Sequence, residues 1–141
     1  MRAKRTRALA ALALAVAAGA LAAWAAFAPI SLASRDELFA IPHGTWARRM
    51  AGDKVEILPP TIRLTLGVND VLLLRNLDDV PQVFGPALIM PGQSFRLPFE
   101  VASTYSFACT AHASGQLQVV VYPTPEPGWP TLVWRLRRWT Q

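Results

Sequence analysis

The sequence predicts an all-β fold, a Greek-key β-sandwich, with one hydrophobic helix at its N-terminus. Two observations predict the sandwich: about seven apolar runs of strand length recur along the chain, and turn signals such as Gly67-Val68-Asn69-Asp70 and Pro91-Gly92 separate them. No amphipathic pattern inside the domain is long enough for a helix. A third observation is that residues 8–28 carry no charge and are mostly Ala, Leu and Val. This run predicts the N-terminal helix.

The composition fits one domain with a short appendage. The chain has 141 residues, 52% of them apolar and 16% charged, so it is rich in core-forming side chains. Its net charge of +5 comes largely from the N-terminus, where residues 2–7 hold four of the 14 basic side chains. Removing these four leaves 10 basic residues against 9 acidic ones. The sequence therefore predicts no nucleic-acid partner, since no basic stripe remains.

Residues 1–33 are interpreted as a signal anchor or a signal peptide. The uncharged run has about the 20 residues that a helix needs to cross a bilayer, and it exceeds the usual core of a signal peptide. We therefore favour an anchor whose basic residues 2–7 stay in the cytoplasm. The alternative is cleavage after Ser31-Leu32-Ala33 or Ala26-Phe27-Ala28. Both interpretations place the rest of the chain outside the cytoplasm, periplasmic or at the cell surface, and secreted if the segment is cleaved.

Residues 34–123 are expected to form the domain. Its first part, residues 34–53, is mixed in character and contains the turn signal Pro42-His43-Gly44. Pro86 and Pro91-Gly92 bracket an additional short apolar piece. The alternation of apolar and polar residues, or a short continuous apolar run, predicts strands at residues 54–58, 61–66, 71–75, 82–84, 94–99, 103–109 and 116–122.

Residues 124–141 are interpreted as a Pro-rich linker followed by a tail rich in Trp and Arg. If the tail is helical, Leu132, Leu136 and Trp139 share one face, and the arginines fall elsewhere. Trp and Arg together are typical of helices at a membrane interface. The alternative is a terminal element that packs on the domain itself, and the sequence does not favour one over the other.

The residues with the clearest chemical potential are Cys109 and His112. Cys109 is the only cysteine of the chain, and His112 is one of two histidines. They lie three residues apart where a loop joins two predicted strands, so both side chains can reach one soft metal ion. The alternatives are that Cys109 is a small buried hydrophobic residue and that His112 only caps a strand end.

Several pieces of sequence together resemble the cupredoxins, the blue-copper family of plastocyanin and azurin. They are the loop Asn76-x-Asp78-x-x-Pro81, the turn Pro91-Gly92-Gln93, and the strand Thr104-Tyr105-Ser106-Phe107 that leads into Cys109-x-x-His112. The resemblance covers about residues 60–123. It implies a cupredoxin-like sandwich that binds one copper ion through the histidine of a Pro-His pair, the cysteine, a second histidine and a weak axial methionine.

Two of these implied ligands are replaced. Gln82 stands where the Pro-His histidine would be, and the axial position falls on Gln116 or Leu117. The candidate metal residues are therefore Cys109, His112, Gln82, Gln116 and Leu117. An amide oxygen is a poorer ligand for Cu(II) than an imidazole, and an apolar neighbour disfavours the more highly charged ion. We expect Cu(I) to bind better than Cu(II), without blue-copper colour.

The remaining polar residues near this motif are expected to have structural roles. His43 is expected to be a solvated loop histidine, because nothing in its spacing directs it to Cys109. Asp78 and Asp79 are expected to shape their loop through bonds from side chain to backbone. Asn76 is expected to do the same and to tie the two ligand loops together.

Three hypotheses for function remain. The first is a membrane-tethered, extracytoplasmic copper-binding or electron-transfer protein, not an enzyme, with a membrane-associated redox or copper-handling partner. The second is a metal-free interaction module on the outer face of the membrane. The third is a redox-active thiol, which requires a lowered pKa at Cys109.

Overall fold

The computed structural model describes residues 2–54 and 56–140 and divides into two compact units. One unit is Leu32–Thr124. The other unit combines the chain up to Ser31 with the chain from Pro125 onward. We describe each unit by itself.

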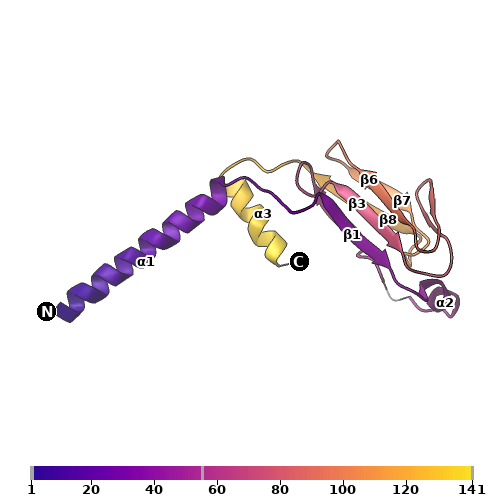
Figure 1. The fold of residues 1–141 in the computed structure, drawn as a ribbon, viewed down its shortest axis with the longest axis horizontal. Helices are drawn as coiled ribbons and strands as arrows, with labels where there is room; N and C mark the ends of the chain where they lie inside the picture. Colours follow the sequence, from indigo (N-terminus) through magenta and orange to yellow (C-terminus); the bar gives the residue numbers. More distant parts are fainter. Residues whose placement is uncertain (1, 55, 141) are drawn as a thin grey trace. The chain divides into compact units, whose positions relative to one another are not determined.

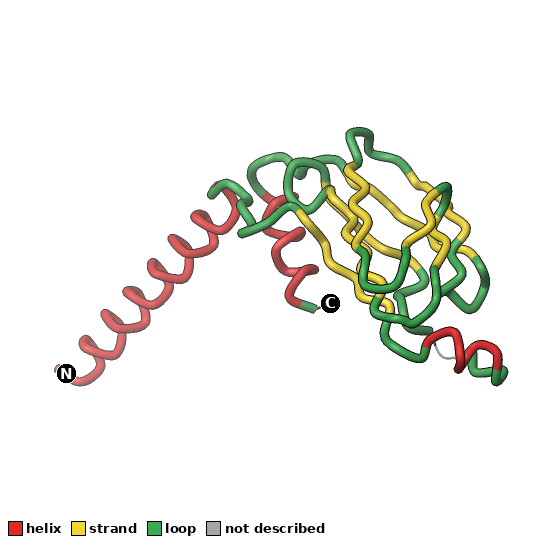
Figure 2. Tube along the Cα trace, turned by 45° about the vertical axis from the view of Figure 1, so that its right-hand side comes forward, coloured by secondary structure: helices red, strands yellow, loops and turns green. Residues whose placement is uncertain are grey.

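The unit Leu32–Thr124 is a β-sandwich, and its strands face one another in two layers in Figures 1 and 2. One sheet has the order β1 (Asp36–Ile41), β3 (Val71–Asn76), β6 (Ser94–Pro98). The other has the order β2 (Thr61–Thr65), β8 (Gln116–Tyr122), β7 (Thr104–Ala108). A two-stranded sheet is formed by β4 (Gln82–Phe84) and β5 (Ala87–Ile89). The chain crosses from one large sheet to the other between β1 and β2, between β2 and β3 and between β6 and β7, and the predicted Greek-key sandwich is confirmed.

The pairing of the strands sets which side chains enter the core. β1 and β3 pair in parallel, as do β2 and β8, whereas β6 and β7 join their sheets antiparallel. Because side chains alternate along a strand, one face of each strand is buried. Thus Leu72 and Leu74 are fully buried on β3, and Leu117 and Val119 are fully buried on β8.

Three elements differ from the prediction. β1 was not predicted, because its sequence, Asp-Glu-Leu-Phe-Ala-Ile, is only partly apolar and its hydrogen bonds to β3 decide its structure. The helix α2 (Thr45–Met50) was also missed, since one and a half turns leave no periodicity to read. The strand predicted at 54–58 is wrong for its described residues, which form bends and loop, while Val55 lies outside the described residues. Leu58 alone of that run is a core residue.

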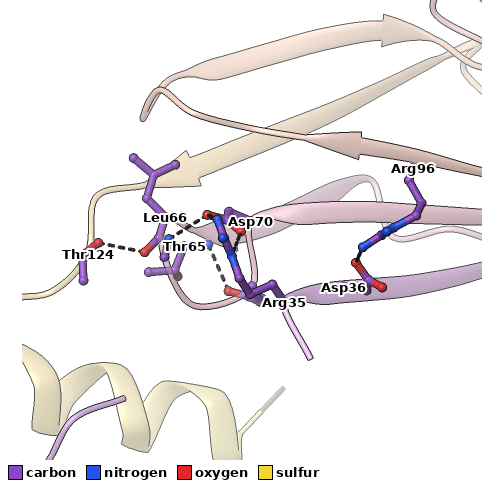
Figure 3. A network of polar contacts seen from close by, with 9 residues as sticks. Arg35, Asp36, Thr65, Leu66, Asp70, Arg96 and Thr124 are labelled. Carbon is purple, nitrogen blue, oxygen red and sulfur yellow. Dashed lines mark hydrogen bonds and ion pairs between the residues drawn. The ribbon is translucent and has the colours of Figure 1, made fainter. Parts of the chain in front are cut away.

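A polar network fixes the start of β1 to the turn between β2 and β3 (Figure 3). The Asp70 carboxylate accepts hydrogen bonds from the Arg35 guanidinium and from the Gly67 N–H, the latter at 2.7 Å. At the same turn, the Thr124 hydroxyl donates to the Leu66 carbonyl at 2.8 Å, which ties the end of the domain to β2. The hydrogen bond from Arg35 holds the pKa of Asp70 below its ordinary value, against the opposing effect of burial.

The second unit contains α1 (Arg2–Phe27) and α3 (Trp129–Trp139). Within α1, residues 5–27 form one helix that is long and apolar enough to cross a membrane by length and composition. The two helices contact each other near the C-terminal end of α1, where the Gly128 N–H donates to the Ala26 carbonyl at 2.9 Å. The predicted N-terminal hydrophobic helix is thus confirmed as a helix.

Candidate metal centre

The two loops that carry the candidate ligands lie side by side at one end of the sandwich. Phe84 of β4 and Cys109 form an isolated β-bridge. Around it, the Gly85 N–H donates to the Ala108 carbonyl at 2.8 Å, and the Thr110 N–H donates to the Val83 carbonyl at 3.1 Å. These bonds extend the β7 edge into β4. Residues 82–84 are therefore joined to the cysteine loop by backbone hydrogen bonds.

Cys109 is buried in the hydrophobic core. It is 2% exposed and belongs to the hydrophobic core cluster that includes Phe84 and Leu117. Burial raises the pKa of its thiol, although the backbone N–H groups of Ala111 and His112 and the charge of Arg49 act in the opposite direction. A raised pKa contradicts the third hypothesis, because a redox-active thiol needs a thiolate at neutral pH. A metal would have to displace the thiol proton.

His112 is buried beside the cysteine loop rather than exposed to water. Its side chain is 5% exposed. The Nδ1 atom lies 2.8 Å from the Ser114 hydroxyl and accepts the Ser114 N–H at 3.4 Å. The Nε2 atom lies 3.2 Å from a carboxylate oxygen of Glu56, yet the approach does not meet hydrogen-bond geometry. In the described part of the chain Nε2 is therefore a buried polar atom without an aligned hydrogen bond.

These contacts indicate which ring nitrogen of His112 carries the proton. A backbone N–H can only donate, so the contact from Ser114 makes Nδ1 an acceptor. The proton of the neutral ring then lies on Nε2, on the side of the Glu56 carboxylate. A carboxylate beside one ring nitrogen is the usual arrangement that leaves the other nitrogen as a metal ligand. The Ser114 hydroxyl lies 2.8 Å from Nδ1 and donates to the Gln116 carbonyl at 3.0 Å.

Gln82 joins the two loops through its side chain. It is 1% exposed, and its amide oxygen accepts the Thr110 hydroxyl at 2.6 Å. Its amide nitrogen donates to the Asp78 carboxylate at 3.0 Å. The Val83 N–H also donates to the Thr110 hydroxyl, at 2.9 Å. Both ends of the Gln82 amide are thus engaged in hydrogen bonds that hold the loops together.

Asp78 anchors the segment that follows β1. Its carboxylate accepts the N–H groups of Gly44 and Trp46, each at 2.8 Å, at the start of α2. Burial opposes the charge of Asp78, but these bonds together with those from Asp79 and Gln82 hold its pKa below its ordinary value. The expected loop-shaping role of Asp78 is confirmed by its bond from the Asp79 N–H.

The same segment also contacts the cysteine loop. From α2, the Arg49 guanidinium donates to the Ala111 carbonyl at 3.0 Å. Farther along, Glu56 approaches His112 and accepts the Ala113 N–H at 3.4 Å. Gly44 and Trp46 thus contact the loop of Asp78, and Arg49 and Glu56 contact the cysteine loop.

The remaining candidate ligands, Leu117 and Gln116, differ in burial. Leu117 is fully buried and apolar, whereas the side chain of Gln116 is exposed. Asn76 was expected to tie the two loops together, but its side-chain amide bonds the Val80 and Ile89 carbonyls and the Asp78 N–H instead. The tie between the loops is supplied by Gln82.

His43 is exposed, as expected, and its Nδ1 lies 3.0 Å from the Asp79 carboxylate. Ligand atoms of His43, Asp78 and Asp79 lie within 4.8 Å of one another. The oxygens of Asp78 are already hydrogen-bonded to backbone and amide N–H groups, so this cluster reads as a loop-stabilising arrangement.

Sequence reasoning missed Glu56, Ser114 and Thr110. Ser114 and Thr110 lie within the cysteine loop, and their distance from His112 along the chain could have indicated them. Glu56 comes from 56 residues upstream of His112, so only the fold brings it to the imidazole.

Comparison with known proteins finds similarity at the level of solved structures. No protein-family model and no curated protein matches the sequence. The purple cupredoxin from Nitrosopumilus maritimus is similar, with 22% identity and a TM-score of 0.44 over 61% of this chain and 99% of that one. Amicyanin from Paracoccus versutus is 16% identical, with a TM-score of 0.44 over 64% of this chain and 84% of that one.

A Cu(I) form of an amicyanin variant is also similar, with 20% identity and a TM-score of 0.44 over 64% of this chain and 85% of that one. These likenesses concern the fold, and the roles of individual residues rest on the contacts described above.

Proposed function

We propose that this protein is a membrane-tethered, extracytoplasmic copper-binding protein that holds one copper ion through Cys109 and His112. Its task is copper capture or short-range electron transfer with a partner in the same membrane. Gln82, Gln116 and Leu117 enter the proposal as neighbours of the ion. The tether is α1, and the basic residues 2–7 favour an orientation with the domain outside the cytoplasm.

One observation carries the proposal. The thiol of Cys109 and the imidazole of His112 are buried on the same turn, and the Glu56 carboxylate lies beside the Nε2 atom of that imidazole. Cys109 is 2% exposed, and the His112 side chain is 5% exposed. The Nε2 atom faces the Glu56 carboxylate at 3.2 Å, which leaves Nδ1 as the nitrogen available to a metal ion.

The donor set fits Cu(I) better than Cu(II). A thiolate and an imidazole suit a soft ion at low coordination number. The third donor of a blue-copper site is replaced by Gln82, whose oxygen already accepts the Thr110 hydroxyl. The fully buried Leu117 and Phe84 make an apolar surround that disfavours the more highly charged ion. When bound, copper would supply one-electron redox chemistry or a transferable Cu(I) ion.

The test is an anaerobic Cu(I) titration of the full chain in detergent, in competition with a chromogenic Cu(I) chelator. We expect Cys109→Ser to abolish stoichiometric binding, and Ser106→Ala, an exposed change on β7, to leave it intact. Equal Cu(I) affinity in the parent and in Cys109→Ser would refute the proposal.

The second candidate is a metal-free interaction module. It is favoured by the engagement of both ends of the Gln82 amide and by the place of Cys109 in the hydrophobic core. It predicts that copper leaves the melting temperature unchanged. A copper-binding protein must instead become more stable as free copper exceeds the dissociation constant.

A further inference from the structure

The helix α3 carries a row of four apolar side chains, of which three are exposed and Leu132 is half-buried. Trp129, Leu132, Leu136 and Trp139 are spaced by three or four residues and therefore lie along one face. Of these, Trp129 is 73% exposed, Leu136 is 61% exposed and Trp139 is 92% exposed. We call this row the apolar stripe of α3. So much exposed aromatic and aliphatic surface on one short helix marks an interaction surface.

α3 contacts the end of α1 through Arg135, which lies at the edge of the apolar stripe, three residues from Leu132 and four from Trp139. The Arg135 guanidinium donates to the carbonyls of Ala28 at 2.9 Å and Pro29 at 3.2 Å, just beyond the last residue of α1. It also lies 5.9 Å from the centre of the Trp24 ring. Thr131, the buried residue of α3, donates its hydroxyl to the Glu126 carbonyl at 2.8 Å. These contacts attach α3 to the residues where the apolar run of α1 ends.

The charges of α3 complement a phospholipid surface. The helix contains Arg135, Arg137 and Arg138 and no acidic residue. Arg137 and Arg138 are in its last turn and are exposed, off the line of the apolar stripe. A cationic face beside a Trp- and Leu-rich face is the pattern of helices that lie in the headgroup region of a bilayer. Trp24 near the end of α1 is also typical of a residue at the membrane interface.

We infer that α3 is an interfacial helix that lies in the outer surface of the same bilayer that α1 crosses. Its apolar stripe enters the boundary of the acyl chains, and Arg137 and Arg138 contact lipid phosphates. The inference rests on the membrane tether of the proposed function and is independent of copper. The occupant of the stripe is lipid because the contacts of Arg135 hold α3 at the end of the apolar run of α1.

The test uses the full chain, with Cys109→Ser as background, reconstituted in vesicles of phosphatidylcholine with or without phosphatidylglycerol. An environment-sensitive fluorophore is attached at one new cysteine: Leu136→Cys on the stripe, Arg138→Cys away from it, or Leu12→Cys within α1. We expect the probe at 136 to emit at shorter wavelength and to be quenched by spin-labelled lipid. Iodide in the water should quench it several-fold less than the probe at 138.

The probe at Leu12 separates two kinds of failure. If Leu12 is protected from iodide and the probes at 136 and 138 are quenched alike, α3 is not interfacial, although the tether holds. If iodide also quenches the probe at 12, the tether of the proposed function fails as well. In the parent chain, we expect phosphatidylglycerol in the vesicles to reduce iodide quenching of the probe at 136. The double variant Arg137→Gln, Arg138→Gln should lose this reduction. Unchanged protection would overturn the assignment of the arginines to lipid phosphates.

Discussion

The Thr110 hydroxyl donates to the amide oxygen of Gln82 at 2.6 Å, and this bond joins the first residue of β4 to the loop after β7. The same hydroxyl accepts the Val83 N–H. In this chain the residue at the expected position of a copper-binding histidine is thus a hydrogen-bonding connection between two loops.

Replacing Thr110 by Val should destabilise the domain by about 1–3 kcal/mol, because the buried Gln82 oxygen and the Val83 N–H each lose a partner. Urea unfolding followed by circular dichroism would measure the loss. Thr104→Val, the same exchange at an exposed site on β7, serves as the control and should change the free energy of unfolding little. An equal loss in both variants would contradict a specific role for the Thr110–Gln82 bond.

Replacing Gln82 by His should supply a second imidazole next to Cys109 and His112. We expect Cu(II) to bind more tightly and to produce strong visible absorption that the parent protein lacks. The exchange should also cost about 1–3 kcal/mol of stability, since the bonds to Thr110 and Asp78 are lost. Gln82→Leu loses the same bonds without adding a ligand. Absorption that is equal for the two variants would mean that position 82 does not face the ion.

Removing the Glu56 carboxylate should remove one of the contacts that hold the His112 ring in its orientation. In the metal-free parent, nitrogen NMR of the neutral ring should show the ring proton on Nε2. In Glu56→Leu we expect a mixture of tautomers and a Cu(I) affinity lower by about 10–100-fold, the usual effect of losing such a partner. Glu56→Gln keeps one acceptor and should lose less. An unchanged tautomer in Glu56→Leu would show that Ser114 alone orients the ring.

The ion pair of Asp70 with Arg35 should make stability depend on pH. Because the pKa of Asp70 is lowered in the folded state, its contribution is complete above the ordinary value of about 3.9. It is lost as the pH falls through the folded-state pKa. We expect Asp70→Asn to be less stable than the parent at neutral pH, with the difference shrinking below about pH 4. Urea unfolding over a pH series would measure both curves. A difference that is constant with pH would contradict this account.

The fold could be predicted from the sequence where burial imposes a strong pattern. The strands around Leu72 and Val119 were predicted because their apolar residues alternate or run together, and both side chains are fully buried. β1 could not be predicted, since its pairing with β3 depends on a partner more than 30 residues away along the chain, as for Asp36 and Val71. α2 is held by the bonds of its first N–H groups to Asp78, which no local pattern reveals.

The candidate site could be predicted only as far as Cys109 and His112, whose short spacing is visible in the chain. Their surroundings depend on contacts over long sequence distances. Glu56 reaches His112 across 56 positions, and Gln82 reaches Thr110 across 28. The sequence indicates that position 82 lacks an imidazole, but only the structure shows the two hydrogen bonds that its amide makes.

The parallel pairing of β2 with β8 has a consequence for biogenesis. Thr61 pairs with Gln118, and β7 also needs β8 as its partner, so the second sheet cannot form until the last strand of the domain has been synthesised. Such distant pairing slows folding relative to helical proteins of similar size. Until β8 pairs, the Cys109 thiol stays open to oxidants and to other thiols. Newly made chains should therefore depend on reductants or chaperones until β8 has paired. The folded protein should not, because its Cys109 is buried.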